Sequence, residues 1–136
     1  MPDKAILDSN IIASIAFKER TSLNALKAVA ECDPMTLDLA VAEVGNVAWK
    51  HVNLTGEDQQ LAFDALRDAL DFISESCDII RSLDLADSAY KISVENNVAF
   101  YDALFLAASA RGQAPLLTLD KKMYDKVKGK MNVRLI

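Results

Sequence analysis

The sequence predicts an α/β fold, a three-layer α/β/α sandwich in which helices cover both faces of a parallel β-sheet. Residues 5–7, Ala-Ile-Leu, form an apolar run without alternation, which is typical of a strand buried on both faces. Short apolar segments then alternate along the chain with longer segments of helical periodicity, the pattern of parallel strands joined by helices. Because such crossovers are right-handed, the strand ends should meet on a shared edge of the sheet.

Each expected element has its own local signal. We expect strands, from their short apolar runs, at residues 5–7, 35–37, 78–81, 116–119 and 133–135. We expect helices, from apolar residues at three- and four-residue spacing or from the segments between strands, at residues 11–16, 22–30, 39–51, 55–73, 84–96, 101–111 and 121–127.

Several helix ends are predicted from capping residues. Asp38 is expected to be the N-cap of the helix that follows it. Thr55 and Asp58 resemble a capping box in which Asp replaces the usual Glu or Gln. Asp84 is expected to cap the helix at residues 84–96, and Gly112 is expected to end the apolar helix at residues 101–111.

Composition limits the class of protein. With 136 residues and a hydrophobic fraction of 51%, the chain is expected to form a single ordered domain, residues 1–136. No apolar run approaches the ~20 residues of a membrane span, and the first strand begins too early for a signal peptide, so we expect a cytoplasmic protein without membrane association. Cys32 and Cys77 are expected to be reduced core thiols. The net charge of -5 argues against coating nucleic acid through bulk charge, but not against a local basic patch.

Two carboxylates share one sequence context. Asp8 directly follows the first predicted strand, Asp120 directly follows the strand at 116–119, and each precedes a helix. If the two strands are neighbours in a parallel sheet, these carboxylates lie side by side and repel each other unless a cation lies between them. The simpler alternative is that each carboxylate only caps the helix that follows it.

Two further carboxylates stand alone in apolar segments. Asp102 is the only charged residue within 98–110, and Glu43 is the only one within 39–47. A helix N-terminus would stabilise Asp102, and a lone helical Glu is commonly solvated, so structural roles remain open for both. Asn46 lies three residues after Glu43 on the same helix face, and we count it as an accessory polar residue.

Four segments, in this order, resemble the motifs of the PIN-domain family: Ile6-Leu7-Asp8-Ser9-Asn10, Ala42-Glu43-Val44-Gly45-Asn46, Tyr101-Asp102-Ala103-Leu104-Phe105-Leu106-Ala107 and Thr118-Leu119-Asp120. Over essentially its whole length the chain is similar to the small ribonuclease toxins of VapBC toxin–antitoxin systems. The resemblance implies a sheet of four or five strands. It further implies an acidic set that binds Mg²⁺ or Mn²⁺, formed by Asp8, Glu43, Asp102 and Asp120, and accessory polar positions at Ser9 or Asn10 and Thr118.

The ligand types favour one class of metal and reaction. Oxygen ligands with no His or Cys partner select Mg²⁺ or Mn²⁺ over Zn²⁺. We expect a metal-activated water to hydrolyse a phosphodiester bond in line, leaving a 3′-hydroxyl and a 5′-phosphate. Asp8 and Asp102 are the expected main ligands. Asp120 would bind through water or to a second ion, and Glu43 would be a ligand or a base that orients the water.

The expected substrate is single-stranded or looped RNA rather than duplex. Lys121 and Lys122, next to the last acidic motif, are candidates for binding the RNA backbone. The resemblance also implies a homodimer and a cognate antitoxin protein. We expect the helices before and after Thr55 to form the apolar dimer surface, with Val52 and Leu54 contributing to it.

Other functions remain open on sequence grounds. A phosphotransferase of the haloacid-dehalogenase type needs a second Asp two residues after the first, where this chain has Asn10. A response-regulator receiver needs an early pair of acids, which is absent, although Lys121 follows Asp120. A PIN-like metal-binding module without catalysis is a further alternative, as is a housekeeping RNA-processing nuclease.

Overall fold

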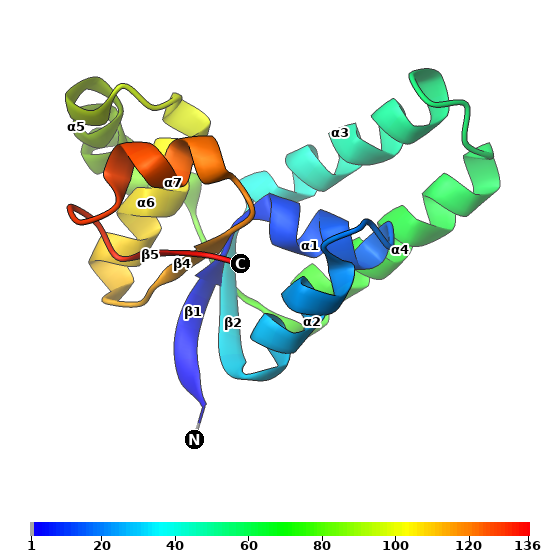
Figure 1. Ribbon diagram of the computed structural model, residues 1–136, viewed down its shortest axis with the longest axis horizontal. Coiled ribbons are helices and arrows are strands. Elements are labelled where there is room, and N and C mark those ends of the chain that lie inside the picture. Colours follow the sequence, from blue (N-terminus) through cyan, green and yellow to red (C-terminus); the bar gives the residue numbers. More distant parts are fainter. Residues whose placement is uncertain (1) are drawn as a thin grey trace.

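The computed structural model describes residues 2–136, which form a five-stranded, all-parallel sheet with helices on both faces (Figure 1). The strands are β1 Asp3–Leu7, β2 Cys32–Leu37, β3 Asp78–Ile80, β4 Leu116–Thr118 and β5 Val133–Leu135. Their order in the sheet is β3-β2-β1-β4-β5, so β1 lies at the centre. The predicted α/β/α sandwich is confirmed.

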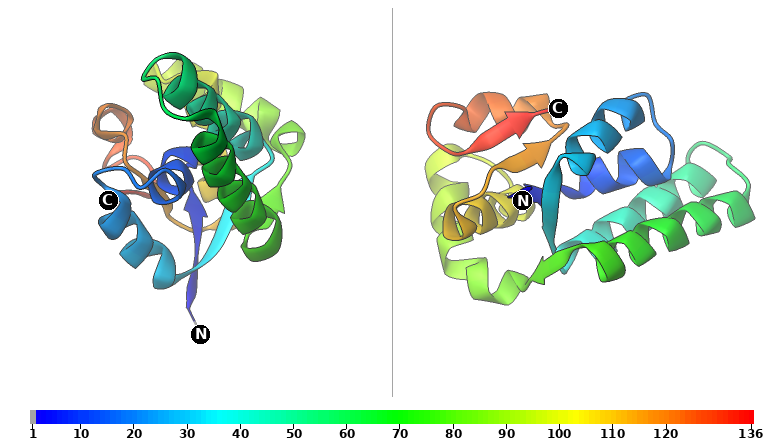
Figure 2. Two further views of the ribbon diagram at one scale, coloured as in Figure 1. Left: turned by 90° about the vertical axis from the view of Figure 1, so that its right-hand side faces the viewer. Right: turned by 90° about the horizontal axis from the view of Figure 1, so that it is seen from below.

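Seven α-helices and one 3₁₀ turn connect the strands within the described residues. They are α1 Ser9–Ala16, α2 Ser22–Ala30, α3 Leu39–Asn53, α4 Gln59–Ser76, the turn η1 Ser82–Leu85, α5 Ala86–Asn96, α6 Phe100–Gly112 and α7 Lys121–Val127. Helices α1 to α4 pack on one face of the sheet, and η1, α5, α6 and α7 pack on the other (Figure 2).

The central strands contribute alternate residues to two separate hydrophobic cores. Ile6 packs with the core under α5, α6 and α7, whereas Ala5 and Leu7 pack with the core under α1 to α4. In β4, Leu116 and Leu117 divide between the two cores in the same way. Burial on both faces explains why these strands read as unbroken apolar runs rather than as alternating ones.

The capping predictions hold in part. Asp38 caps α3 as expected, with its carboxylate accepting a hydrogen bond from the Leu39 N–H at 2.9 Å. The capping box at Thr55 is wrong, because Asp58 itself is the N-cap of α4 and accepts from the N–H groups of Gln60 and Leu61 at 3.1 and 3.0 Å. Because the Asp58 carboxylate already accepts from two backbone N–H groups at the start of α4, the Thr55 hydroxyl has no capping role there.

Three other boundaries differ from the sequence prediction. Asp84 does not cap a helix but lies inside the 3₁₀ turn η1. Helix α6 includes Gly112, and the left-handed residue that ends it is Gln113. Strand β2 begins at Cys32 and includes Pro34, which was expected to lie before the strand. Pro34 is tolerated there because β3 pairs with β2 only from Met35 onward, so Pro34 precedes that ladder.

Helices α3 and α4 form an antiparallel hairpin that projects beyond the sheet (Figures 1 and 2). Several large apolar side chains of this hairpin remain exposed, namely Trp49, Leu54, Leu61 and Phe63.

Cys32 and Cys77 are free thiols at the edge of the core under α1 to α4, partly rather than fully buried. None of the helices in residues 2–136 combines the length and apolar character that crossing a bilayer requires.

The capping geometry leads to the first prediction. Asp58→Ala should lower the free energy of unfolding by about 1 kcal/mol, because two N–H groups of α4 lose their acceptor. Chemical denaturation of both variants checks this, with Thr55→Ala as the matched control. The Thr55 hydroxyl donates to the His51 carbonyl at 2.6 Å instead of capping α4, so its loss should matter less. A larger cost at Thr55 than at Asp58 would contradict the assignment.

Candidate functional site

The carboxyl ends of β1 and β4 lie side by side and bring the first and last predicted motifs together. Leu7 is in register with Leu117, and the Asp8 N–H donates to the Leu117 carbonyl at 3.0 Å. Asp8, which follows β1, and Thr118, the last residue of β4, therefore lie next to each other at one edge of the sheet. This edge is where parallel α/β sheets bind ligands.

Asp8 is buried, with 6% of its surface exposed, and neutral groups hold its carboxylate in place. Oδ2 accepts hydrogen bonds from the Thr118 hydroxyl at 2.7 Å and from the Asn10 amide at 3.4 Å. Oδ1 faces the Ser9 hydroxyl at 3.4 Å. The carboxylate accepts no capping hydrogen bond from α1, so the simple N-cap alternative does not apply to Asp8.

Asp120, in contrast, is the N-cap of α7. Its Oδ1 accepts from the Met123 N–H at 3.0 Å, and its own N–H donates to the Thr118 hydroxyl at 3.1 Å. Asn10 joins the two strand ends, because its Oδ1 accepts from the Leu119 N–H at 3.1 Å while its amide donates to Thr118 at 3.3 Å. The cap is thus compatible with a second role, since only one oxygen of Asp120 serves the helix.

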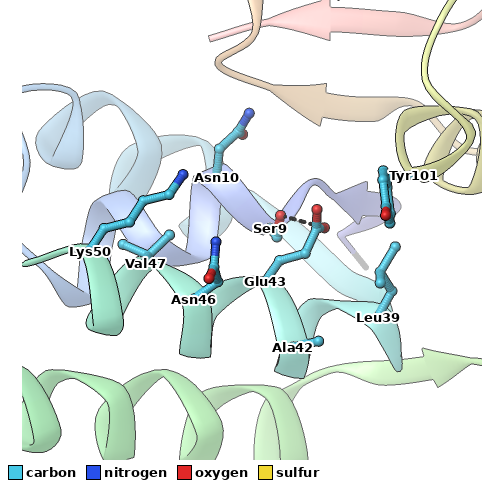
Figure 3. A pocket seen from close by; sticks show the side chains of 9 residues that line it. All are labelled: Ser9, Asn10, Leu39, Ala42, Glu43, Asn46, Val47, Lys50 and Tyr101. Carbon is cyan, nitrogen blue, oxygen red and sulfur yellow. Dashed lines mark hydrogen bonds between the residues drawn. The ribbon is translucent and has the colours of Figure 1, made fainter. Parts of the chain in front are cut away.

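Glu43 reaches the same edge from α3. Its Oε1 accepts a hydrogen bond from the Ser9 hydroxyl at 2.8 Å, and the carboxylate is half-buried (Figure 3). Burial raises the pKa of Glu43, and the bond from Ser9 acts against that rise. The alternative that Glu43 is simply a solvated surface residue does not apply, because a side chain of another helix, Ser9 of α1, holds its carboxylate.

Asp102 lies in the first turn of α6 and makes no capping hydrogen bond. Burial raises the pKa of its carboxyl, and the charges of Asp120 and Glu43 raise it further, while Lys126 lowers it. For Asp8 the pKa rises to about 7, mainly through burial and then through the charges of Asp102 and Glu43, against the bond from Thr118. Asp102 is thus near enough to Asp8, Glu43 and Asp120 for their charges to interact, which places the four predicted acids around one edge of the sheet.

This donor set fits a hard divalent cation with a partly hydrated shell. Within residues 2–136, no three Asp, Glu, His or Cys side chains lie close enough together to enclose an ion by themselves. Mg²⁺ commonly retains several waters and uses one or two carboxylates, so a fully closed cage is not required. The oxygen-only donors and their unbalanced negative charge match that preference.

A hollow of about 420 Å³ opens beside Glu43, between α1, α3 and the start of α6 (Figure 3). Ser9, Asn10 and Asn46 line it, as do Lys50 and Tyr101, which the sequence reasoning missed. A signal for Lys50 was present in the sequence. It follows Glu43 by seven residues and Asn46 by four, which places all three on one face of α3.

The two lysines predicted to bind RNA are less well placed. The Lys121 amine pairs with Asp125 at 2.8 Å on the exposed side of α7, and Lys122 is exposed on the same helix. Lys126 is the cation that acts on Asp102, and its amine donates to the Asn97 carbonyl at 2.7 Å. His51, the only histidine, is bonded to Glu57 and stacks on Phe17.

Comparisons with known proteins identify the family of this chain. The PIN domain family model matches residues 5–130. Ribonuclease VapC3 of Pyrobaculum aerophilum is 30% identical over 126 residues, which cover 90% of this chain and 94% of that protein. Exonuclease VapC9 of the same organism is 28% identical over 100 residues, covering 74% of this chain and 71% of that protein.

Solved structures share the fold at lower sequence identity. A toxin–antitoxin complex from Klebsiella pneumoniae matches with a TM-score of 0.71 and 21% identity, covering 96% of this chain and 95% of that chain. VapC20 of Mycobacterium tuberculosis, described as a sarcin-ricin loop cleaving toxin, matches with a TM-score of 0.70 and 17% identity, covering 96% and 98%.

The buried Asp8 leads to a prediction of pH-dependent stability. Its pKa is about 7 in the folded protein against 3.8 for an ordinary carboxyl, so the folded state binds this proton more tightly than the unfolded state. Its contribution to stability is therefore full below pH 4 and is lost as pH rises to 7, by up to roughly 4 kcal/mol in metal-free protein.

Asp8→Asn should remove this loss, because an amide carries no charge and can keep the bonds with Thr118 and Ser9. The measurement is denaturant unfolding in EDTA between pH 4 and 8, as the difference between the wild type and the variant, which cancels the titration of other groups. A difference that stays constant across this range would show that Asp8 is already ionised in the folded protein.

Proposed function

The chain belongs to the PIN-domain family, and from this premise we propose that it is a Mg²⁺- or Mn²⁺-dependent endoribonuclease that cuts single-stranded or looped RNA. The observation that carries the proposal is the convergence of Asp8, Glu43, Asp102 and Asp120 at one sheet edge, where the charges of Asp102 and Glu43 raise the pKa of Asp8 and those of Asp120 and Glu43 raise the pKa of Asp102. The similarity to Ribonuclease VapC3 supports the same class of activity.

Each residue of the set has a distinct task in this proposal. Asp8 and Asp102 would hold the ion, and Asp120 would contribute its remaining oxygen through water or to a second ion. Glu43, oriented by Ser9, completes the ligand set or accepts a proton from the attacking water. When bound, Mg²⁺ or Mn²⁺ supplies a Lewis acid that stabilises charge on the phosphate and lowers the pKa of water.

The bond changes follow from these positions. The water oxygen forms a bond to phosphorus as the P–O3′ bond breaks. The water gives up one proton and the departing O3′ takes up one from solvent, which leaves a 3′-hydroxyl and a 5′-phosphate. Thr118 and Asn10 keep the Asp8 carboxylate in one rotamer, because both donate hydrogen bonds to it. Both are also fixed in position, since Thr118 is the last residue of β4 and Asn10 accepts a hydrogen bond from the Leu119 N–H. Such preorganisation means that no side chain has to reorient when charge develops.

A PIN-like module that binds metal without catalysis is the second candidate. The open hollow beside Glu43 favours the enzyme, because a purely structural metal site is normally closed by protein ligands, whereas a catalytic site keeps room for substrate. Whether the nuclease is a toxin or a housekeeping enzyme depends on its partners. The toxin–antitoxin complex from Klebsiella pneumoniae, which shares this fold, supports the toxin.

The proposed partners are a second copy of the chain and a cognate antitoxin.

The α3–α4 hairpin supports a self-complementary dimer surface, because it exposes apolar side chains that include Trp49, Leu54 and Phe63. Light scattering at micromolar concentration should give a dimer, and Trp49→Glu should shift it toward monomer; a monomeric wild type would contradict this surface. An adjacent small gene whose product co-purifies with the chain would identify the antitoxin.

The nuclease proposal is tested by cleavage of an RNA hairpin with an unpaired loop. We expect cuts in the loop with Mn²⁺ and none in EDTA, because the carboxylates alone repel a phosphate. Asp102→Asn should lower the rate by at least about tenfold, since it removes a charge that holds the ion and no core volume. Cuts in the stem, or cuts that persist in EDTA, would reject the proposal. Metal binding by calorimetry without any cleavage would favour the non-catalytic module.

A further inference from the structure

We propose that the RNA strand runs from the acidic site along α3 in a groove, and that the Lys50 amine binds a neighbouring backbone phosphate there. This inference rests on the proposed ribonuclease function and assigns the path of its substrate. Lys50 thereby becomes a substrate-positioning residue outside the four acidic motifs.

The groove consists of two adjoining hollows. The first, beside Glu43, shares Asn10, Val47 and Lys50 with a second hollow of about 520 Å³ that continues toward the tip of the α3–α4 hairpin. Both volumes lie in the range of roughly 300–1,000 Å³ that is typical of ligand sites. Lys50 stands at their junction, so a strand that occupies both hollows must pass its side chain.

The spacing on α3 suits a chain of phosphates. Lys50 follows Glu43 by two helical turns, a rise of about 10 Å. Figure 3 shows the Glu43 carboxylate, the Asn46 amide and the Lys50 amine extending from α3 toward α1. A phosphate at the acidic end is held through a cation, and a phosphate at the other end meets an amine directly. The uncharged Asn46 amide lies between them and can donate a hydrogen bond to the strand.

Lys50 is the only Lys or Arg among the described residues that line either hollow. No ion pair engages its amine within residues 2–136, whereas the amine of Lys121 is paired with Asp125. Glu19, in the loop after α1, lines the second hollow. Its negative charge repels a polyanion from that wall and so favours a path along α3. The neighbouring His51 is already bonded to Glu57.

The far end of the first hollow provides an aromatic surface. Tyr101, at the start of α6, is 61% exposed and lines the hollow with Glu43. Single-stranded nucleic acids are commonly bound by a cation on the backbone together with aromatic rings on which bases stack. A net charge of -5 disfavours long-range attraction of RNA, so such local contacts must supply the affinity.

The test compares Lys50→Ala with Lys91→Ala, which removes the same charge from an exposed position on α5, away from the groove. Binding of a labelled, unstructured RNA is measured by fluorescence anisotropy with Ca²⁺ in place of Mn²⁺. We expect Lys50→Ala to weaken binding about fivefold at 0.1 M salt and to reduce the salt slope by about 0.7. Lys91→Ala should leave both nearly unchanged, and neither variant should change the melting temperature.

Cleavage kinetics separate positioning from chemistry. Lys50→Ala should raise KM for the hairpin substrate with little change in kcat, and the defect should disappear with RNAs too short to reach Lys50. If the wild type binds and cuts RNA but Lys50→Ala behaves like Lys91→Ala, the groove assignment is wrong and the ribonuclease proposal stands. If the wild type neither binds nor cuts RNA, both proposals fail.

Discussion

The site depends on the Asp8 carboxylate, a charge that is buried at the carboxyl end of the central strand. Hydrogen bonds from Thr118 and Asn10 stabilise its ionised form only in part, because burial and the charges of Asp102 and Glu43 raise its pKa to about 7. Unpaired buried charge is costly, so the fold retains here an interaction that works against its own stability. A bound divalent cation would offset both the cost of burying the charge and the repulsion between the carboxylates.

The sheet order explains how residues far apart in the sequence share this edge. With β1 at the centre and β4 beside it, the first and last motifs meet directly, and Asn10 and Thr118 bridge them. Helices α3 and α6 cover opposite faces of the sheet, so Glu43 and Asp102 approach the edge from the two sides. Neutral hydroxyl and amide groups orient Asp8 and Glu43, and no cationic side chain within residues 2–136 is directly bonded to Asp8.

Charge is distributed unevenly around the proposed RNA path. Glu43 marks the acidic end, Lys50 the basic end, and polar uncharged groups lie between them. The lysines of α7 follow Asp120 in the sequence, which predicted that they bind the RNA backbone, but their contacts differ from that prediction. Lys121 is paired within its own helix, and Lys126 is anchored to Asn97, from where it moderates the charge of Asp102. Local pairing therefore decides which lysines are available to a polyanion.

The fold class and the parallel sheet could be predicted from the sequence, and the four acids could be singled out from it as candidates. Unbroken apolar runs indicate burial on both faces, and a lone charge inside an apolar segment is a candidate site residue because burying it without a partner is costly. The tertiary structure was needed to show that the Asp8 carboxylate, unlike that of Asp120, accepts no capping hydrogen bond, that Asp58 rather than Thr55 is the N-cap of α4, and that Lys50 lines the hollow beside Glu43. Those outcomes depend on which donors and cations come within bonding distance after β1 and β4 pair and α3 packs against α1, and no local pattern encodes such distances.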